Sequence, residues 1–272
     1  MTGTLAQLIA LTSYGNHFLR KGELEPGFYP VNSTFQFCDH VDFREMSKLF
    51  FFSKYSEKII CQDPIEWFNF LKKEKTKKLH LFYRPSEDLK MGKDYKLAGF
   101  VGGGGTWMIE QRCQNYSYYW QARWTFNSEE KEKDKKWTVN YARFARKILS
   151  TNADQSLERL REEFRKALSE IASFAFAQNL HGWANTFQKA LYELTNLTPG
   201  EAYYHKDLVP KSDFTINNLQ LLFSAAMAWV FGGMGSWNDL TFEDPEAGQR
   251  YDELSERLYA CLNAALVGVI NS

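Results

Sequence analysis

Few residues of this chain are equipped for acid–base chemistry, and two of them stand out by their surroundings. Glu110 follows a run of four glycines inside an alternating stretch at 106–113, where a carboxyl group could accept or donate a proton. Arg112 lies two residues further on, so we favour a simple cross-strand ion pair over catalysis. His181 opens a helical segment, where capping of the helix is the favoured alternative. Both residues are weak candidates for a catalytic role.

A first glycine-rich segment contains Gly102, Gly103, Gly104 and Gly105 and is followed by Trp107. Phosphate-binding loops stand between a strand and a helix, because the helix N-terminus supplies N–H groups to the phosphate. Here strand-like sequence continues directly after the glycines, and no GKS or GKT triplet is present. We therefore expect a tight hairpin, a bulge or a close backbone approach, with room for a ligand or partner to contact bare backbone.

A second glycine-rich segment at 232–235 leads into Ser236, Trp237, Asn238 and Asp239, between two predicted helices. Loops held by rigid helices are favoured places for recognition, and tryptophan is enriched among binding hot spots. These four residues are therefore candidates for contact with a partner or ligand. The alternative, which we favour slightly, places Trp237 in the core between helices and lets Asn238 and Asp239 cap neighbouring backbone. The exposure of Trp237 distinguishes the two interpretations.

The remaining chemistry-bearing residues do not form a motif. The five histidines and four cysteines show no metal-ligand spacing, and neither HExxH nor GxSxG occurs. We expect no metal and no cofactor. The cysteines, which are far apart in the chain, are predicted to be buried, reduced thiols, as is typical of a cytoplasmic protein; they are Cys38, Cys61, Cys113 and Cys261.

Composition excludes some classes of partner. Lys+Arg and Asp+Glu number 33 each, so the formal net charge is zero, which argues against a broad nucleic-acid surface. The chain start lacks the pattern of a signal peptide, and the longest apolar run, at 219–234, is too short for a bilayer. We expect a cytoplasmic protein that binds neither nucleic acid nor membrane.

The elements that position these residues follow from hydrophobic periodicity. In the first half we expect a helix at 4–21 and another that begins at Asp63 and Pro64. Strands are expected at 34–38, 48–54, 57–62, 78–83, 95–101, 106–113, 118–126 and 137–144. The second half switches to a helical period, with helices at 152–175, 180–194, 214–231 and 249–270. The third of these is apolar on most sides and is expected to be the central, buried helix.

Together these elements predict an α+β protein. Its N-terminal part should be a mixed or antiparallel sheet with one or two helices, and its C-terminal part an all-α bundle of about four helices. We expect a sheet domain over residues 1–150 and a helical domain over 151–272 packed on it, with one continuous domain as the alternative.

Four stretches of the chain together resemble an uncharacterised, full-length bacterial family. They read LTSYGN at 11–16, FYPVNSTF at 28–35, AGFVGGGG at 98–105 and FGGMGSWND at 231–239. The family is similar to proteins that accompany polymorphic or secreted toxins. The resemblance implies an immunity role, in which the protein binds a cognate toxin and blocks its active site. It brings no catalytic residues.

Three functions are consistent with these features. The first is a cytoplasmic binding protein of the immunity type, whose exposed aromatic and polar loops mask a toxin. The second is an enzyme that acts on a small polar substrate at the glycine-rich loop 102–105, with Glu110 and His181 participating. The third is an oligomeric scaffold, because the sequence leaves undecided whether the chain forms a homo-oligomer. We favour the first, because recognisable catalytic machinery is lacking.

Overall fold

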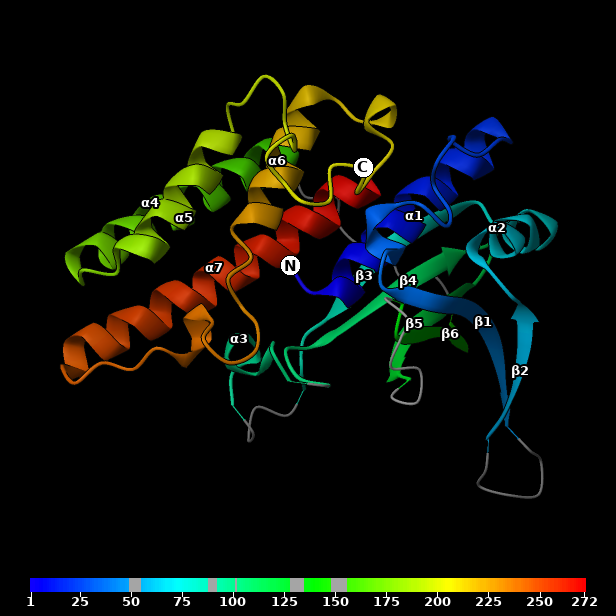
Figure 1. Cartoon of the computed structure of the whole chain (residues 1–272), viewed down its shortest axis with the longest axis horizontal. Helices are drawn as coiled ribbons and strands as arrows, with labels where there is room; N and C mark the ends of the chain where they lie inside the picture. Colours follow the sequence, from blue (N-terminus) through cyan, green and yellow to red (C-terminus); the bar gives the residue numbers. More distant parts are fainter. Residues whose placement is uncertain (49–54, 88–91, 101, 128–134, 148–155) are drawn as a thin grey trace.

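The computed structural model describes residues 1–48, 55–87, 92–100, 102–127, 135–147 and 156–272 (Figure 1). The helices are α1 (Gly3–Lys21), α2 (Pro64–Lys73), α3 (Asp94–Leu97), α4 (Leu157–Ala177), α5 (His181–Glu193), α6 (Ile216–Met227) and α7 (Pro245–Asn271). The strands are β1 (Cys38–Lys48), β2 (Tyr55–Cys61), β3 (Lys78–Arg84), β4 (Thr106–Arg112), β5 (Ser117–Phe126) and β6 (Trp137–Lys147). Short 3-10 helices lie at Ser33–Phe35, Lys211–Asp213 and Trp237–Asp239.

The described strands form one six-stranded sheet in the order β2-β1-β6-β5-β4-β3. β1 runs parallel to β6, and the other neighbours are antiparallel. One face of the sheet carries an aromatic layer, in which the Trp67 ring of α2 stacks on Phe43 at 4.4 Å and meets Trp120 edge-on at 5.4 Å. The predicted α+β class, with a mixed sheet in the first half and helices in the second, is confirmed.

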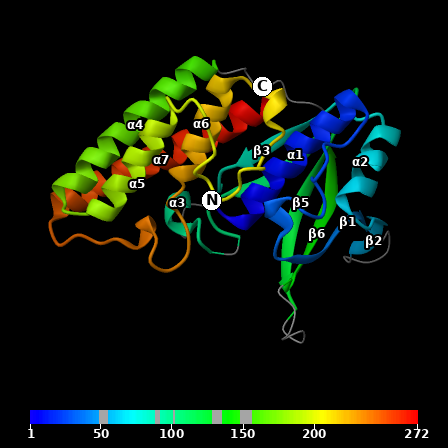
Figure 2. The ribbon, with the colours of Figure 1, turned by 45° about the horizontal axis from the view of Figure 1, so that its top comes forward.

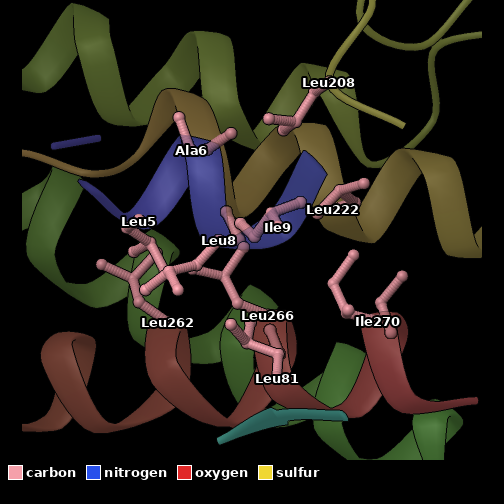
Figure 3. Packing of buried hydrophobic residues seen from close by; sticks show 14 of the residues in the cluster. Leu5, Ala6, Leu8, Ile9, Leu81, Leu208, Leu222, Leu262, Leu266 and Ile270 are labelled. Atoms are coloured by element: carbon pink, nitrogen blue, oxygen red, sulfur yellow. The ribbon is translucent and has the colours of Figure 1, made fainter. Parts of the chain in front are cut away.

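α1 is the helix that joins the two halves. It is capped by the side chain of Thr2 and ends at Gly22, and it is buried from Leu5 to Phe18. On one side α1 packs against β3, β4 and α2, and on another it contacts α7. Figure 3 shows Leu5, Leu8 and Ile9 of α1 among apolar side chains of α6, α7 and β3. α6 is also buried over Leu219–Ala226, so the expected central helix shares this position with α1.

The C-terminal helices form a layered group around α7. α7 contacts α4, α6 and β3, whereas α5 contacts α4 and α6 (Figures 1 and 2). One hydrophobic cluster extends from Leu5 to Ile270, so the core crosses the expected boundary between 150 and 151. The boundary itself falls among residues outside the described ranges.

Three predicted segments differ in the structure. Residues 95–101 were expected to be a strand, but Asp94–Leu97 is helical. Residues 33–35 form a 3-10 helix because the side chain of Asn32 accepts a hydrogen bond from Thr34 N, and β1 begins only at Cys38. α6 ends at Met227, four residues before the predicted end, because the chain turns to pair Trp237 N with Val230 O. The strand expected at 48–54 lies almost wholly outside the described residues.

Within the described ranges, no helix combines the length and the apolar character needed to cross a membrane.

Candidate functional site

The two glycine-rich loops lie against each other, although they come from opposite halves of the chain. Gly99 approaches Gly232 so closely that a Cβ atom on Gly99 would lie 1.8 Å from the carbonyl oxygen of Gly232. Asn238 Nδ2 donates a hydrogen bond to Lys96 O at 3.4 Å. We call this contact, made by residues 96–100, 102–105 and 231–239, the loop junction.

The first loop is held by a tyrosine of α7, with a second tyrosine nearby. Tyr259 Oη donates to Gly104 O at 2.6 Å, and Tyr83 Oη lies 3.2 Å from the same oxygen. Gly104 is buried and has a φ of +74°, and a Cβ atom there would lie 2.6 Å from the Cα of Ala98. The glycines therefore permit a close backbone approach, which was one of the predicted alternatives. They do not form a tight hairpin turn, because the connection between the antiparallel strands β3 and β4 is long and contains α3.

The neighbours of Gly104 have different exposures. Gly103 and Gly105 are half-buried, whereas Gly102 is exposed and a Cβ atom there would meet open space. Trp107 is half-buried, with its ring 4.7 Å from that of Tyr83. Of the residues predicted in this loop, Gly102 is the one that offers bare backbone to solvent.

The second loop is shaped by its own polar side chains. Asn238 Oδ1 accepts from Gly232 N at 3.0 Å, and Asn238 Nδ2 donates to Gly232 O at 3.1 Å. Asp239 Oδ2 accepts from Gly235 N at 2.7 Å. Ser236 is half-buried, and a Cβ atom on Gly232 would lie 2.8 Å from its Oγ. The predicted capping role of Asn238 and Asp239 is confirmed. Their hydrogen bonds to the backbone hold the loop in one conformation.

Trp237 belongs to the core. Its side chain is fully buried, and its Nε1 donates to Ser255 Oγ at 2.8 Å. Trp183 and Phe187 of α5 meet the indole edge-on at 5.8 and 5.1 Å. The core interpretation of Trp237 is thus confirmed, and this residue is removed from the predicted contact residues because a buried indole does not touch a partner.

The loop junction exposes two large apolar side chains that the sequence argument missed. Phe100 in the first loop is 67% exposed, and Met234 in the second is 103% exposed. Met234 lies between Gly233 and Gly235, and Phe100 follows Gly99, so these neighbours offer no side chains to cover them. A large apolar residue next to glycines in a loop is the signal that would have found them.

Glu110 is buried on β4 and fully engaged. Arg112 Nε donates to its Oε2 at 3.0 Å, and Ser117 Oγ donates to its Oε1 at 2.7 Å. The predicted ion pair is confirmed, although the two residues lie on the same strand and not on neighbouring ones. Both carboxylate oxygens are buried and occupied by protein donors, so neither is free to contact a substrate.

His181 is exposed at the first position of α5, and its ring meets Phe176 edge-on at 5.6 Å. The N-cap of this helix is Leu180, so the predicted capping role of His181 is wrong. Glu110 lies in the sheet and His181 in the helical layer that contacts α4 and α6, so the two weak catalytic candidates do not share a site.

Within the described part of the chain, no group of three or more His, Cys, Asp or Glu side chains is placed to hold a metal ion. Cys38, Cys61 and Cys113 are buried as expected, Cys261 is partly buried, and all four are free thiols. Burial raises the pKa of Tyr259, the tyrosine that holds Gly104, to about 12, so its hydroxyl stays protonated as a donor near neutral pH.

The fold and the loop junction define a mixed α+β protein in which glycine loops from both halves build one surface. Comparison with protein-family models, with curated proteins and with solved structures gives no match to the chain.

Proposed function

We propose that this chain is a binding protein of the immunity type, which recognises a toxin through the loop junction. The observation that supports this proposal best is the exposure of Phe100 and Met234 on two loops that contact each other. Exposed apolar side chains that gather on one surface are typical of sites for protein association.

The rigidity of both loops favours affinity. Asn238 and Asp239 hold the second loop by side-chain hydrogen bonds, and Tyr259 holds Gly104 in the first. A preformed loop loses little conformational entropy when a partner binds, so more of the contact energy contributes to affinity. Phe100 and Met234 would supply the apolar anchors, and the exposed glycine backbone would supply hydrogen-bonding groups.

The nature of the partner rests on the resemblance to proteins that accompany toxins. The enzyme alternative at loop 102–105 has less support, because Glu110 is engaged by Arg112 and Ser117 and His181 lies in a different layer. The scaffold alternative would use the same exposed side chains to join copies of this chain.

Co-expression with a candidate toxin encoded beside this gene tests the proposal. We expect the wild-type chain to co-purify with the toxin and to protect the cells, and the Phe100→Asp/Met234→Asp double variant to lose both properties. The matched control replaces Phe176 and Leu197 by Asp, because these side chains are 67% and 82% exposed on the helical half. Absence of a complex and of protection with the wild-type chain would contradict the proposal, as would full protection by the double variant.

A further inference from the structure

A cavity of about 640 Å³ lies beside the loop junction, between α7 and residues 83–86 and 93–95. Two elements that are distant in sequence contribute polar groups to it, among them Asp94 from α3 and Asn263 from α7. Aromatic and aliphatic side chains form much of the remaining wall, among them Tyr83, Tyr95, Tyr259 and Val267. The volume is in the range of sites that hold small molecules.

One side-chain oxygen of Asp94 is occupied and the other is free. Tyr83 Oη and Ser86 N both lie 3.0 Å from Asp94 Oδ2 and donate to it. Asp94 Oδ1 is buried and has no hydrogen-bond partner among the described residues. This carboxylate is therefore held in place by its neighbours while half of its accepting capacity is unused.

Asn263 presents a second unused acceptor. Its side chain is only 5% exposed, and its Oδ1 has no partner within the described part of the chain. The orientation of the amide follows from Tyr259, whose hydroxyl proton is donated to Gly104 O. The hydrogen bond between Asn263 and Tyr259 must then be donated by the amide nitrogen, which leaves Oδ1 as the free atom.

Two buried acceptors without donors carry a free-energy cost that a ligand with donors removes. One acceptor is a carboxylate oxygen, which favours a positive charge, and the tyrosine rings offer aromatic faces that attract cations. The positive charge of Lys93 in the wall is offset by Glu256, whose Oε2 lies 2.8 Å from Lys93 Nζ.

We infer that this cavity binds a small organic cation, an amine with at least two N–H or O–H donors on an apolar body. Its ammonium group pairs with Asp94 Oδ1, its second donor bonds to Asn263 Oδ1, and its apolar part lies against Tyr83, Tyr259 and Val267. The site goes beyond the proposed recognition of a toxin, because it needs neither Phe100 nor Met234.

Calorimetric titration of the purified full chain tests this site. The probes are α,ω-diaminoalkanes of increasing length, which scan the separation of the two acceptors, and tyramine, which combines an ammonium group with a phenol. Dicarboxylates of matching lengths serve as ligand controls. We expect at least one amine to bind and no dicarboxylate to do so.

Asp94→Asn keeps the shape of the side chain and removes its charge, so it should weaken amine binding by about tenfold or more. Asp252→Asn is the matched control: it removes the same charge from a residue that bonds to Tyr95 Oη and does not line the cavity. Ala264→Phe fills the cavity from a partly exposed position of α7 and should abolish binding without altering the polar network. Lack of amine binding by the wild-type chain overturns the inference, and so does undiminished binding by the folded Ala264→Phe variant.

Discussion

Asn271 binds both backbone polar groups of Leu81. Its Nδ2 donates to Leu81 O at 2.9 Å, and Leu81 N donates to its Oδ1 at 2.7 Å. In the same strand, Asn16 of α1 pairs in the same way with Leu79, at 2.8 and 2.7 Å. Because β3 is an edge strand, the two asparagines satisfy backbone groups that would otherwise be open to another strand.

Replacement of Asn271 by Leu should therefore destabilise the fold. The change leaves Leu81 N and O without partners, which costs about 1–3 kcal/mol for each buried group. Denaturant unfolding followed by tryptophan fluorescence measures the free energy of unfolding. Asn69→Leu on α2 is the control, because Asn69 is exposed and, among the residues that the structure describes, bonds only to Ile65 O within its own helix. Equal stabilities of the two variants would contradict the role of Asn271.

A methyl group at Gly99 should separate the two loops. The Cβ atom would lie 1.8 Å from Gly232 O, a backbone atom that has no flexible side chain to move aside. We expect Gly99→Ala to lower the free energy of unfolding by about 1–3 kcal/mol or more. Gly233→Ala is the control, because open space surrounds a Cβ atom there and its φ lies outside the left-handed region. A thermal midpoint for Gly99→Ala equal to that of Gly233→Ala would show that the loops are not in tight contact.

Much of the fold could be predicted because its elements carry clear local signals. Asp63 and Pro64 are a capping pair, and the structure places them at the start of α2, where Asp63 Oδ1 accepts from Ile65 N and Glu66 N. The apolar stripe at 157–175 corresponds to α4. The segment at 95–101 was mispredicted because a short apolar run suits either a strand or a helix. Tertiary contacts favour the helix here, since the hydroxyl of Tyr95 donates to Asp252 Oδ1 at 2.6 Å.

The site was less accessible to sequence reasoning, for two physical reasons. Asn238 and Asp239 have polar side chains that suit both recognition and capping, and only their bonds to Gly232 and Gly235 distinguish the two. The cavity depends on Asp94 and Asn263, which are distant in sequence and belong to no motif. Their unpaired oxygens can be identified only when the hydrogen-bond partners of the neighbouring groups are known.

Thiol reactivity should follow burial. Burial raises the pKa of Cys38 and Cys113, and burial together with nearby Glu66 raises that of Cys61 to about 12. The thiolate is the reactive form, so these thiols should react slowly with a disulfide reagent at pH 8. Burial raises the pKa of Cys261 as well, but this thiol is more exposed than the other three and should react first among the four. Mass spectrometry of the labelled protein identifies the site, and rapid labelling of Cys61 in the folded chain would contradict the expectation.

Stability should fall as the pH falls below 6.5. Burial lowers the pKa of His205 to about 4, whereas an unperturbed histidine has a pKa of about 6.5. Between these values the unfolded chain binds a proton that the folded chain does not, so the free energy of unfolding decreases by up to about 1.4 kcal/mol per pH unit. His80, whose pKa burial lowers to about 3, adds to this slope.

His205→Asn should reduce the slope between pH 6.5 and 5, because the asparagine amide can replace the hydrogen bond between His205 Nδ1 and Ser33 Oγ without titrating. Urea unfolding at several pH values measures the slope. His181→Asn, at an exposed position of α5, serves as the control. A slope unchanged by His205→Asn would contradict the assignment.

The most direct test of the proposed recognition through the loop junction is the dissociation constant measured between this protein and a candidate toxin encoded beside its gene. Truncation of an apolar anchor at an interface typically costs about 2 kcal/mol or more, so the Phe100→Ala/Met234→Ala variant should bind about thirtyfold more weakly than the wild-type chain. Phe176→Ala/Leu197→Ala should bind as the wild type does. Equal affinities of the wild-type chain and the Phe100→Ala/Met234→Ala variant would contradict the account.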